Sequence, residues 1–139
     1  METKTKINIE VLVNSSVEKV WKHWNTPESI MKWYFASDDW HAPRALNELK
    51  VGGKFMTRME SKDGSMGFDF EGTYTKVELN KLIEYVLADD RKIIVTFTVQ
   101  GKGTLVTERF DPENVNPIEM QKSGWQAILD NFKKFTEGK

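Results

Sequence analysis

The apolar positions of the last segment repeat with the period of a helix. Between residues 116 and 139, large apolar side chains recur every three or four positions, which places them on one face of an α-helix. They are Trp125, Ile128, Leu129, Phe132 and Phe135. Asn116 is the expected N-cap, with Pro117 at the first helical position and Glu119 three residues after the cap. Because this much aromatic surface has to be buried, the pattern predicts a long helix that packs its apolar face against another layer of secondary structure.

The middle of the chain alternates apolar and polar positions instead, which is the period of a half-buried β-strand. A first strand is expected at residues 6–13, and several more follow Gly53. The turns expected between these later strands are at residues 62–65, 80–81, 89–91 and 100–103. If residues 89–91 form a three-residue loop, Tyr85 lies opposite Val95. Antiparallel hairpins in succession are therefore predicted.

The turn at residues 62–65 fixes the register of its hairpin. Counting outward from it, Met59 lies opposite Phe68 on one face, and Arg58 lies opposite Asp69 on the other. We expect the first pair to face inward and the charged pair to be exposed neighbours on the outer face.

Two short helices are expected after the first strand. Ser15 and Glu18 have the spacing of a capping box for the first helix. Thr26 is the expected cap of the second, which runs through Ile30 to about Trp33. Residues 36–50 are mostly polar and are expected to form a long loop.

The order is therefore strand, two short helices, about six further strands and a long helix, which is an α+β arrangement. A curved sheet that holds a helix on one face tends to enclose a cavity. The 139 residues suit one domain with one core, so residues 1–139 are expected to form a single domain.

The composition of the chain argues against several kinds of partner and chemistry. The chain has 20 basic and 21 acidic residues, so charge gives no reason to expect nucleic acid or an anionic membrane as a partner. No apolar run approaches the length of a membrane span, and residues 1–11 lack a secretory signal pattern. Cysteine is absent, which excludes disulfides and thiolate chemistry. A cytoplasmic monomer is expected.

Several segments resemble one known family over nearly the whole chain. They are Trp33 and residues 49–55 (LKVGGKF), 68–74 (FDFEGTY), 104–108 (TLVTE) and 121–129 (QKSGWQAIL). They are similar to bacterial proteins related to the activator of the heat-shock-protein-90 ATPase, which are often labelled polyketide-cyclase-like. The resemblance implies the helix-grip fold of the START/SRPBCC superfamily, shared with the birch-pollen allergen. In that fold an antiparallel sheet of six to seven strands wraps around the C-terminal helix. The superfamily includes lipid carriers, hormone receptors, cyclases and co-chaperones, so the fold alone does not indicate the function of this chain.

Glu108 is the first candidate for a functional residue. Its position between Val106 and Phe110 places it on the inward face, opposite Val95. A buried carboxylate is costly, so Glu108 is expected to be a polar anchor or an acid/base group with a raised pKa. The alternatives are that a bulge turns Glu108 outward, or that a core Tyr or Trp pairs with it.

The other candidates form an apolar lining for a small-molecule site. They are Trp40, Met59, Phe68, Phe70, Tyr74, Tyr85, Phe97, Trp125 and Ile128, with Trp40 as a gate residue. The alternative is a filled core without a cavity. Gly124 either leaves room for a ligand or allows close helix–sheet packing, and the close packing is the preferred interpretation.

No metal, cofactor or nucleophilic triad is expected. Asp38, Asp39 and His41 lie close in sequence, but a metal site needs three or four supported ligands. Gly52 and Gly53 lack the spacing of a phosphate loop.

Three functions remain open. The first is a module that binds a small, mostly hydrophobic molecule, without catalysis. The second is a cyclase- or dehydratase-type enzyme in which Glu108 moves protons. The third is a co-chaperone that stimulates a heat-shock-protein ATPase. The eukaryotic co-chaperone has a further N-terminal domain for which this chain has no room, so the third function is the least expected.

Overall fold

The structure, a computed structural model, describes residues 6–113 and 116–138. Its strands form one antiparallel sheet of seven, in the order β1-β7-β6-β5-β4-β3-β2. The strands are β1 (Ile7–Val13), β2 (Trp40–Asn47), β3 (Lys54–Ser61), β4 (Gly67–Glu78), β5 (Leu82–Leu87), β6 (Lys92–Gln100) and β7 (Gly103–Phe110). The helices are α1 (Val17–Asn25), α2 (Pro27–Ile30) and α3 (Ile118–Glu137).

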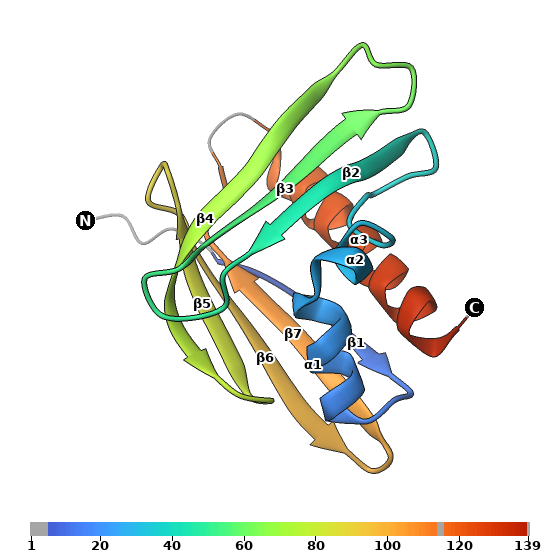
Figure 1. Ribbon diagram of the computed structural model, residues 1–139, viewed down its shortest axis with the longest axis vertical. Coiled ribbons are helices and arrows are strands. Elements are labelled where there is room, and N and C mark those ends of the chain that lie inside the picture. The colour runs from blue at the N-terminus through green and yellow to red at the C-terminus, as the bar shows by residue number, and fades with distance from the viewer. Residues whose placement is uncertain (1–5, 114–115, 139) are drawn as a thin grey trace.

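The sheet curls around the long helix α3, as Figure 1 shows. Helix α3 buries Leu129 and Phe132 completely, and Trp125 and Ile128 are half-buried against the same core. The short helices α1 and α2 lie on the same side of the sheet and follow β1 directly. The α+β helix-grip architecture expected from the sequence is therefore confirmed.

The period-two alternation of the strands also holds. Along β7, Thr104, Val106, Glu108 and Phe110 are buried, and the residues between them are more exposed. Strands β5 and β6 show the same alternation. Because successive side chains point to opposite faces, one face of each strand supplies the core.

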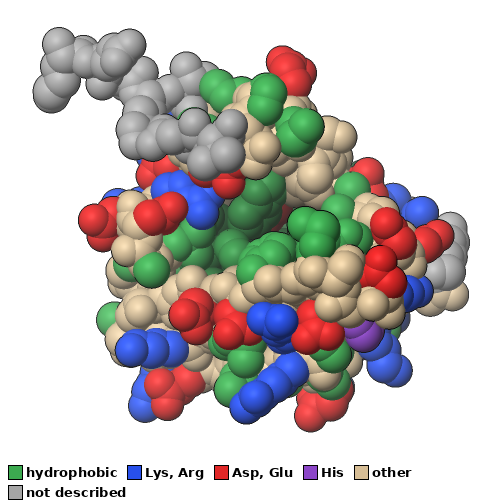
Figure 2. Space-filling model, turned by 90° about the horizontal axis from the view of Figure 1, so that it is seen from above, with side chains coloured by type: hydrophobic (Ala, Val, Ile, Leu, Met, Phe, Trp, Pro, Cys, Tyr) green, Lys and Arg blue, Asp and Glu red, His purple; other side chains and the backbone are tan. Residues whose placement is uncertain are grey.

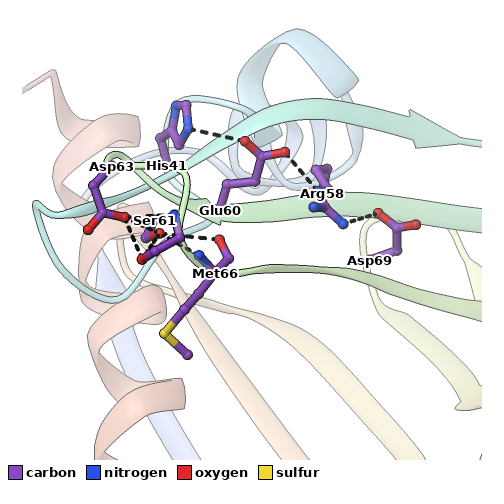
Figure 3. Close-up of polar contacts among 8 residues, drawn as sticks. His41, Arg58, Glu60, Ser61, Asp63, Met66 and Asp69 are labelled. Carbon is purple, nitrogen blue, oxygen red and sulfur yellow. Dashed lines mark hydrogen bonds and ion pairs between the residues drawn. The ribbon is translucent and has the colours of Figure 1, made fainter.

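The register predicted for the β3–β4 hairpin is confirmed. Met59 pairs with Phe68, and Arg58 pairs with Asp69. The Arg58 guanidinium donates from Nη1 to Asp69 Oδ1 at 3.3 Å and from Nε to Glu60 Oε2 at 2.8 Å, a chain of contacts drawn in Figure 3. The tight turn before β4 therefore sets the pairing.

The predicted pairing of Tyr85 with Val95 is wrong by two residues, since Tyr85 lies opposite Ile93. The loop begins one residue earlier than expected. Leu87 N donates to Arg91 O, and Asp90 adopts a positive φ of 69° within the turn. Asp tolerates this left-handed conformation better than most residues. Because the pairing is displaced by two residues and side chains alternate with a period of two, the same side chains of β5 still face inward.

The predicted loop at residues 36–50 is also wrong in part, because Trp40–Asn47 forms the edge strand β2. Strand β2 pairs with β3 and has an irregularity between His41 and Arg44. Pro43 lies within this irregular stretch. Pro and charged residues are typical of edge strands, and they hide the alternation that identifies a strand.

Helix boundaries differ by one to three residues from those predicted. Ser16, and not Ser15, caps α1 by accepting a hydrogen bond from Lys19 N at 3.3 Å. Helix α2 ends at Ile30. Helix α3 begins at Ile118 with Pro117 as its N-cap, and Gly138 ends it with a φ of 79°. The left-handed conformation at Gly138 is a common helix end, and Lys139 lies outside the described residues.

None of the helices in the described part of the chain is both long and apolar enough to cross a membrane.

Candidate functional site

A hollow of about 280 Å³ opens between α3, the β3–β4 hairpin and the segment that joins α2 to β2. It is lined by Tyr34, Ala36, Met59, Phe68, Phe70, Arg91, Glu113, Asn116, Met120, Gln121, Gly124, Trp125 and Ile128. The space-filling view shows a hollow with a floor of hydrophobic side chains (Figure 2). Its volume lies just below the range of roughly 300–1,000 Å³ that is usual for small-molecule sites, and its mostly apolar lining is typical of such sites.

Two regular elements build the apolar walls. Met120, Gly124 and Ile128 are four residues apart on α3, so they share one helix face. Across the hollow, Met59 and Phe68 are strand partners on the inward face of the hairpin. Phe68 is 48% exposed and Met120 is 60% exposed, although both are large apolar side chains. The walls therefore present apolar surface that the protein itself does not cover.

Trp125 and Phe70 form the deeper part of the hollow. Their ring centroids lie 5.4 Å apart in an edge-to-face contact, and Trp125 also packs on Phe110 at 4.6 Å. Phe70 in turn stacks on Tyr34 at 5.8 Å. These contacts fix the aromatic floor, because each ring is held by at least one other ring.

Gly124 opens the hollow on the helix side. A Cβ atom added at Gly124 would meet no atom within 4 Å. The preferred interpretation of this glycine, close packing of helix on sheet, is therefore wrong. Helix α3 stands away from the sheet here, and the missing side chain leaves open space.

The polar groups around the hollow are held by their neighbours. Arg91 donates from Nε to Asp89 Oδ2 at 2.8 Å. Gln121 accepts a hydrogen bond from Glu113 N at 2.8 Å and donates to Asn116 O at 2.7 Å. Gln121 therefore ties the residues before α3 to the helix and fixes one side of the opening.

Glu108 is buried, with 4% of its surface exposed. On β7 it lies between Ile9 of β1 and Val95 of β6, as the sequence predicted. The alternative in which a bulge turns Glu108 outward is therefore wrong. Burial away from water disfavours the charged form and raises the pKa of the Glu108 carboxyl to about 8. Glu108 does not line the hollow itself.

Three tyrosines gather near Glu108, and we call Tyr34, Tyr74, Tyr85 and Glu108 the proton-bearing cluster. Burial raises the phenolic pKa of each tyrosine, and the Glu108 carboxyl raises those of Tyr34 and Tyr85 further. Tyr74 donates to Asn47 Oδ1 at 2.5 Å. Burial therefore favours the protonated form of all four groups.

A second, smaller space of about 30 Å³ also borders Tyr34, and we call it the inner pocket. It is lined by Trp24, Asn25, Ile30, Trp33, Tyr34, Leu46, Asn47, Phe55, Thr57, Tyr74, Ile83 and Tyr85. Tyr34 contributes to both spaces. The Tyr34 side chain therefore borders both spaces, whereas Tyr74 and Tyr85 border only the inner pocket.

The residues predicted for the site are spread over several parts of the core. Six of them line the hollow: Met59, Phe68, Phe70, Gly124, Trp125 and Ile128. Trp40 lies beside it, with its ring centroid 6.1 Å from that of Phe68. Tyr74 and Tyr85 line the inner pocket. Phe97 is 5% exposed and packs on Trp21 and Trp24 at the other end of the core.

Several lining residues were not predicted: Tyr34, Ala36, Arg91, Glu113, Asn116, Met120 and Gln121. Met120 could have been found, because it lies four residues before Gly124 on the helix. The others, apart from Gln121, come from connecting segments, where no period indicates the direction of a side chain. Within residues 6–113 and 116–138, no group of three or more His, Cys, Asp or Glu residues could hold a metal ion.

Comparison with known proteins agrees with this architecture. The solution NMR structure of the AHSA1-like protein from Aeromonas hydrophila is 44% identical, with a TM-score of 0.91 over 96% of this chain and 93% of that chain. The solution structure of Chr148 from Cytophaga hutchinsonii is 56% identical, with a TM-score of 0.83 over 96% and 92% of the two chains. The protein CV1439 from Chromobacterium violaceum shares the fold at 18% identity, with a TM-score of 0.86 over 96% and 98%.

A search of curated proteins finds no match. The family described as "Activator of Hsp90 ATPase homolog 1-like protein" matches residues 14–137, nearly the whole chain. The chain therefore belongs to the family of activator of Hsp90 ATPase homolog 1-like proteins.

Proposed function

We propose that this chain is a cytoplasmic binding protein that takes a small, mostly hydrophobic molecule into the hollow. The observation that carries the proposal is the open apolar space beside Gly124, between α3 and the β3–β4 hairpin. A filled core would have placed a side chain there. A concave apolar space with a few polar groups at its edge is what a ligand site requires.

The exposed side chains at the opening support the same proposal. Phe68 and Met120 leave about half or more of their surface in water. Covering apolar surface stabilises a complex by roughly 25 cal/mol for each Å² removed from water. A hydrophobic ligand between these two side chains would therefore gain contacts that the free protein lacks.

Acid/base catalysis is the second candidate, and Glu108 is the observation that favours it. A general acid or base works best with a pKa near the working pH, and the pKa of Glu108 is raised to about 8. Glu108 does not line the hollow, so binding remains the first proposal. A co-chaperone role rests on the family description alone.

The neutral fluorescent probe N-phenyl-1-naphthylamine tests the binding proposal. Its emission should rise on addition of the protein. In Gly124→Leu the new side chain fills the hollow, and because overpacking costs about 1–3 kcal/mol, the affinity should fall about tenfold or more. Ser123→Leu is the matched control, since Ser123 is the exposed neighbour on the same helix and the control adds the same side chain.

The probe should bind Ser123→Leu and the unaltered protein equally well. Equal affinity for Gly124→Leu, with the variant folded by circular dichroism, would contradict the proposed location. No binding to the unaltered protein would argue against the proposed function.

A further inference from the structure

The hollow has one basic side chain at its edge. Of the described residues that line it, Arg91 alone carries a positive charge and Glu113 alone carries a negative charge. Figure 2 shows basic side-chain atoms beside the hydrophobic floor. The Arg91 side chain comes from the turn between β5 and β6 and is 23% exposed. The hollow therefore combines a mostly apolar surface with one partly buried cation.

The protein fixes Arg91 in place but uses only part of its guanidinium group. Arg91 Nε donates to Asp89 Oδ2 at 2.8 Å, and the backbone N of Arg91 donates to Asp89 Oδ1 at 3.3 Å. Leu87 N donates to Arg91 O at 2.9 Å, which closes the turn. A guanidinium group has five N–H donors, and four of them are on Nη1 and Nη2. None of these four donates to any of the described residues, so they can bind a ligand.

Two carboxylates lie near Arg91, and neither occupies Nη1 or Nη2. Asp89 contacts Nε, and because its side chain is 56% exposed, water weakens the field of its charge. Glu113 Oε1 accepts hydrogen bonds from Asn116 N at 3.1 Å and from Asn116 Nδ2, so it holds the residues before α3. Among the described residues, Glu113 forms no ion pair with Arg91. An anion bound at Nη1 and Nη2 would therefore complete the contacts of the guanidinium group.

We propose that the ligand of the hollow is an amphipathic acid, whose carboxylate accepts hydrogen bonds from Arg91 Nη1 and Nη2 while its apolar body fills the hollow. This inference rests on the proposed binding function and specifies its ligand class. A carboxylate can pair with Arg through two parallel charge-assisted hydrogen bonds, which are stronger than those between neutral groups. The apolar body would lie against Phe68 and Phe70, which offer no polar partner. An ammonium group would instead meet the like charge of Arg91.

Three naphthalene compounds that differ in one group test the charge of the ligand. They are 1-naphthoate, 1-naphthamide and 1-naphthylmethylamine, which are anionic, neutral and cationic at pH 7. Each displaces N-phenyl-1-naphthylamine from the unaltered protein at low salt, and the loss of emission gives its affinity. 1-Naphthoate should bind about tenfold more tightly than 1-naphthamide, because hydrogen bonds to a charged group are worth more than neutral ones. The amine should bind most weakly, and added NaCl should narrow the differences.

Variants assign the preference to Arg91. Arg91→Gln removes the charge, so it should bind 1-naphthoate and 1-naphthamide about equally while still binding N-phenyl-1-naphthylamine. Arg91→Lys keeps the charge and loses the paired hydrogen bonds, so part of the preference should remain. Arg109→Gln is the matched control, because Arg109 is exposed on β7 and does not line the hollow. It should keep the tenfold preference. Circular dichroism checks that each variant folds, and the comparison on the unaltered protein needs no variant.

Four results would overturn the carboxylate proposal and leave the binding function intact. These are equal affinity of the unaltered protein for 1-naphthoate and 1-naphthamide, tightest binding of the amine, the full preference retained in folded Arg91→Gln, and a bound fluorescent probe that none of the three compounds displaces. Failure of N-phenyl-1-naphthylamine itself to bind would instead count against the hollow as a ligand site, and so against the proposed function.

Discussion

Replacing Glu108 with Gln should remove most of the stability that the protein loses as the pH rises from 5 to 9. The pKa of Glu108 is about 8 in the folded protein, against an ordinary value of 4.5. The folded state therefore holds a proton that the unfolded chain releases, and the stability that this proton confers is complete below pH 4.5. It is lost as the pH rises towards 8.

The size of the effect follows from the shift. Each pH unit in this window lowers the free energy of unfolding by about 1.4 kcal/mol, so the whole window corresponds to about 5 kcal/mol. That is a large share of the 5–15 kcal/mol typical of a folded protein. Gln keeps the shape and cannot ionise, so Glu108→Gln should exceed the unaltered protein in stability at pH 9 by several kcal/mol.

Urea unfolding followed by circular dichroism at pH 5, 6, 7, 8 and 9 measures this difference. Glu10→Gln is the matched control, because Glu10 is exposed on the neighbouring strand β1. The control should keep the pH dependence of the unaltered protein. If Glu108→Gln shows the same loss of stability with pH as the control, or if the unaltered protein shows none, the argument from burial is refuted.

Three further predictions concern other parts of the molecule. Gly124→Ala should raise the free energy of unfolding by about 1 kcal/mol in urea titrations, because Ala favours the helix and its Cβ meets open space; a loss of stability would contradict the open geometry. Hydrogen bonds from Ser65 and Ser61 lower the pKa of Asp63 to about 2, so its carboxyl should titrate there by NMR. Ser65→Ala should move that midpoint towards 3.8, and an unchanged midpoint would exclude the bond. Phe132→Ala should cost about 3–5 kcal/mol in thermal melts, since Phe132 is fully buried; a cost below 1 kcal/mol would mean that this end of the core is loosely packed.

The fold could be predicted because its elements bury one face each. The apolar stripe of the helix around Phe132 and the alternation of the strand around Val106 both arise from that burial, so both can be read from the sequence. The register of Met59 with Phe68 was predictable because a short turn joins the two strands. Strand β2 was not, because an edge strand with Pro43 has no clean alternation.

The site was only partly predictable, for a different reason. An inward direction can be read from the alternation of a strand, but the part of the concave face that stays open cannot. Phe97 points inward and meets Trp21 and Trp24, whereas Phe70 points inward and meets the hollow. The distinction depends on where α1 and α3 lie over the sheet. Tyr34 was missed because it lies in a connecting segment without a period.

The most direct test of ligand binding in the hollow is an intermolecular NOE measurement. The protein would carry ¹³C-labelled Met and Ile methyl groups, and the ligand would be N-phenyl-1-naphthylamine. Contacts from the aromatic rings of this probe to the methyl groups of Met59, Met120 and Ile128 are the predicted result. Contacts confined to Met56, which lines a separate surface cleft beside Gly72 and Val86, would contradict the assignment, as would the absence of any contact at saturating probe.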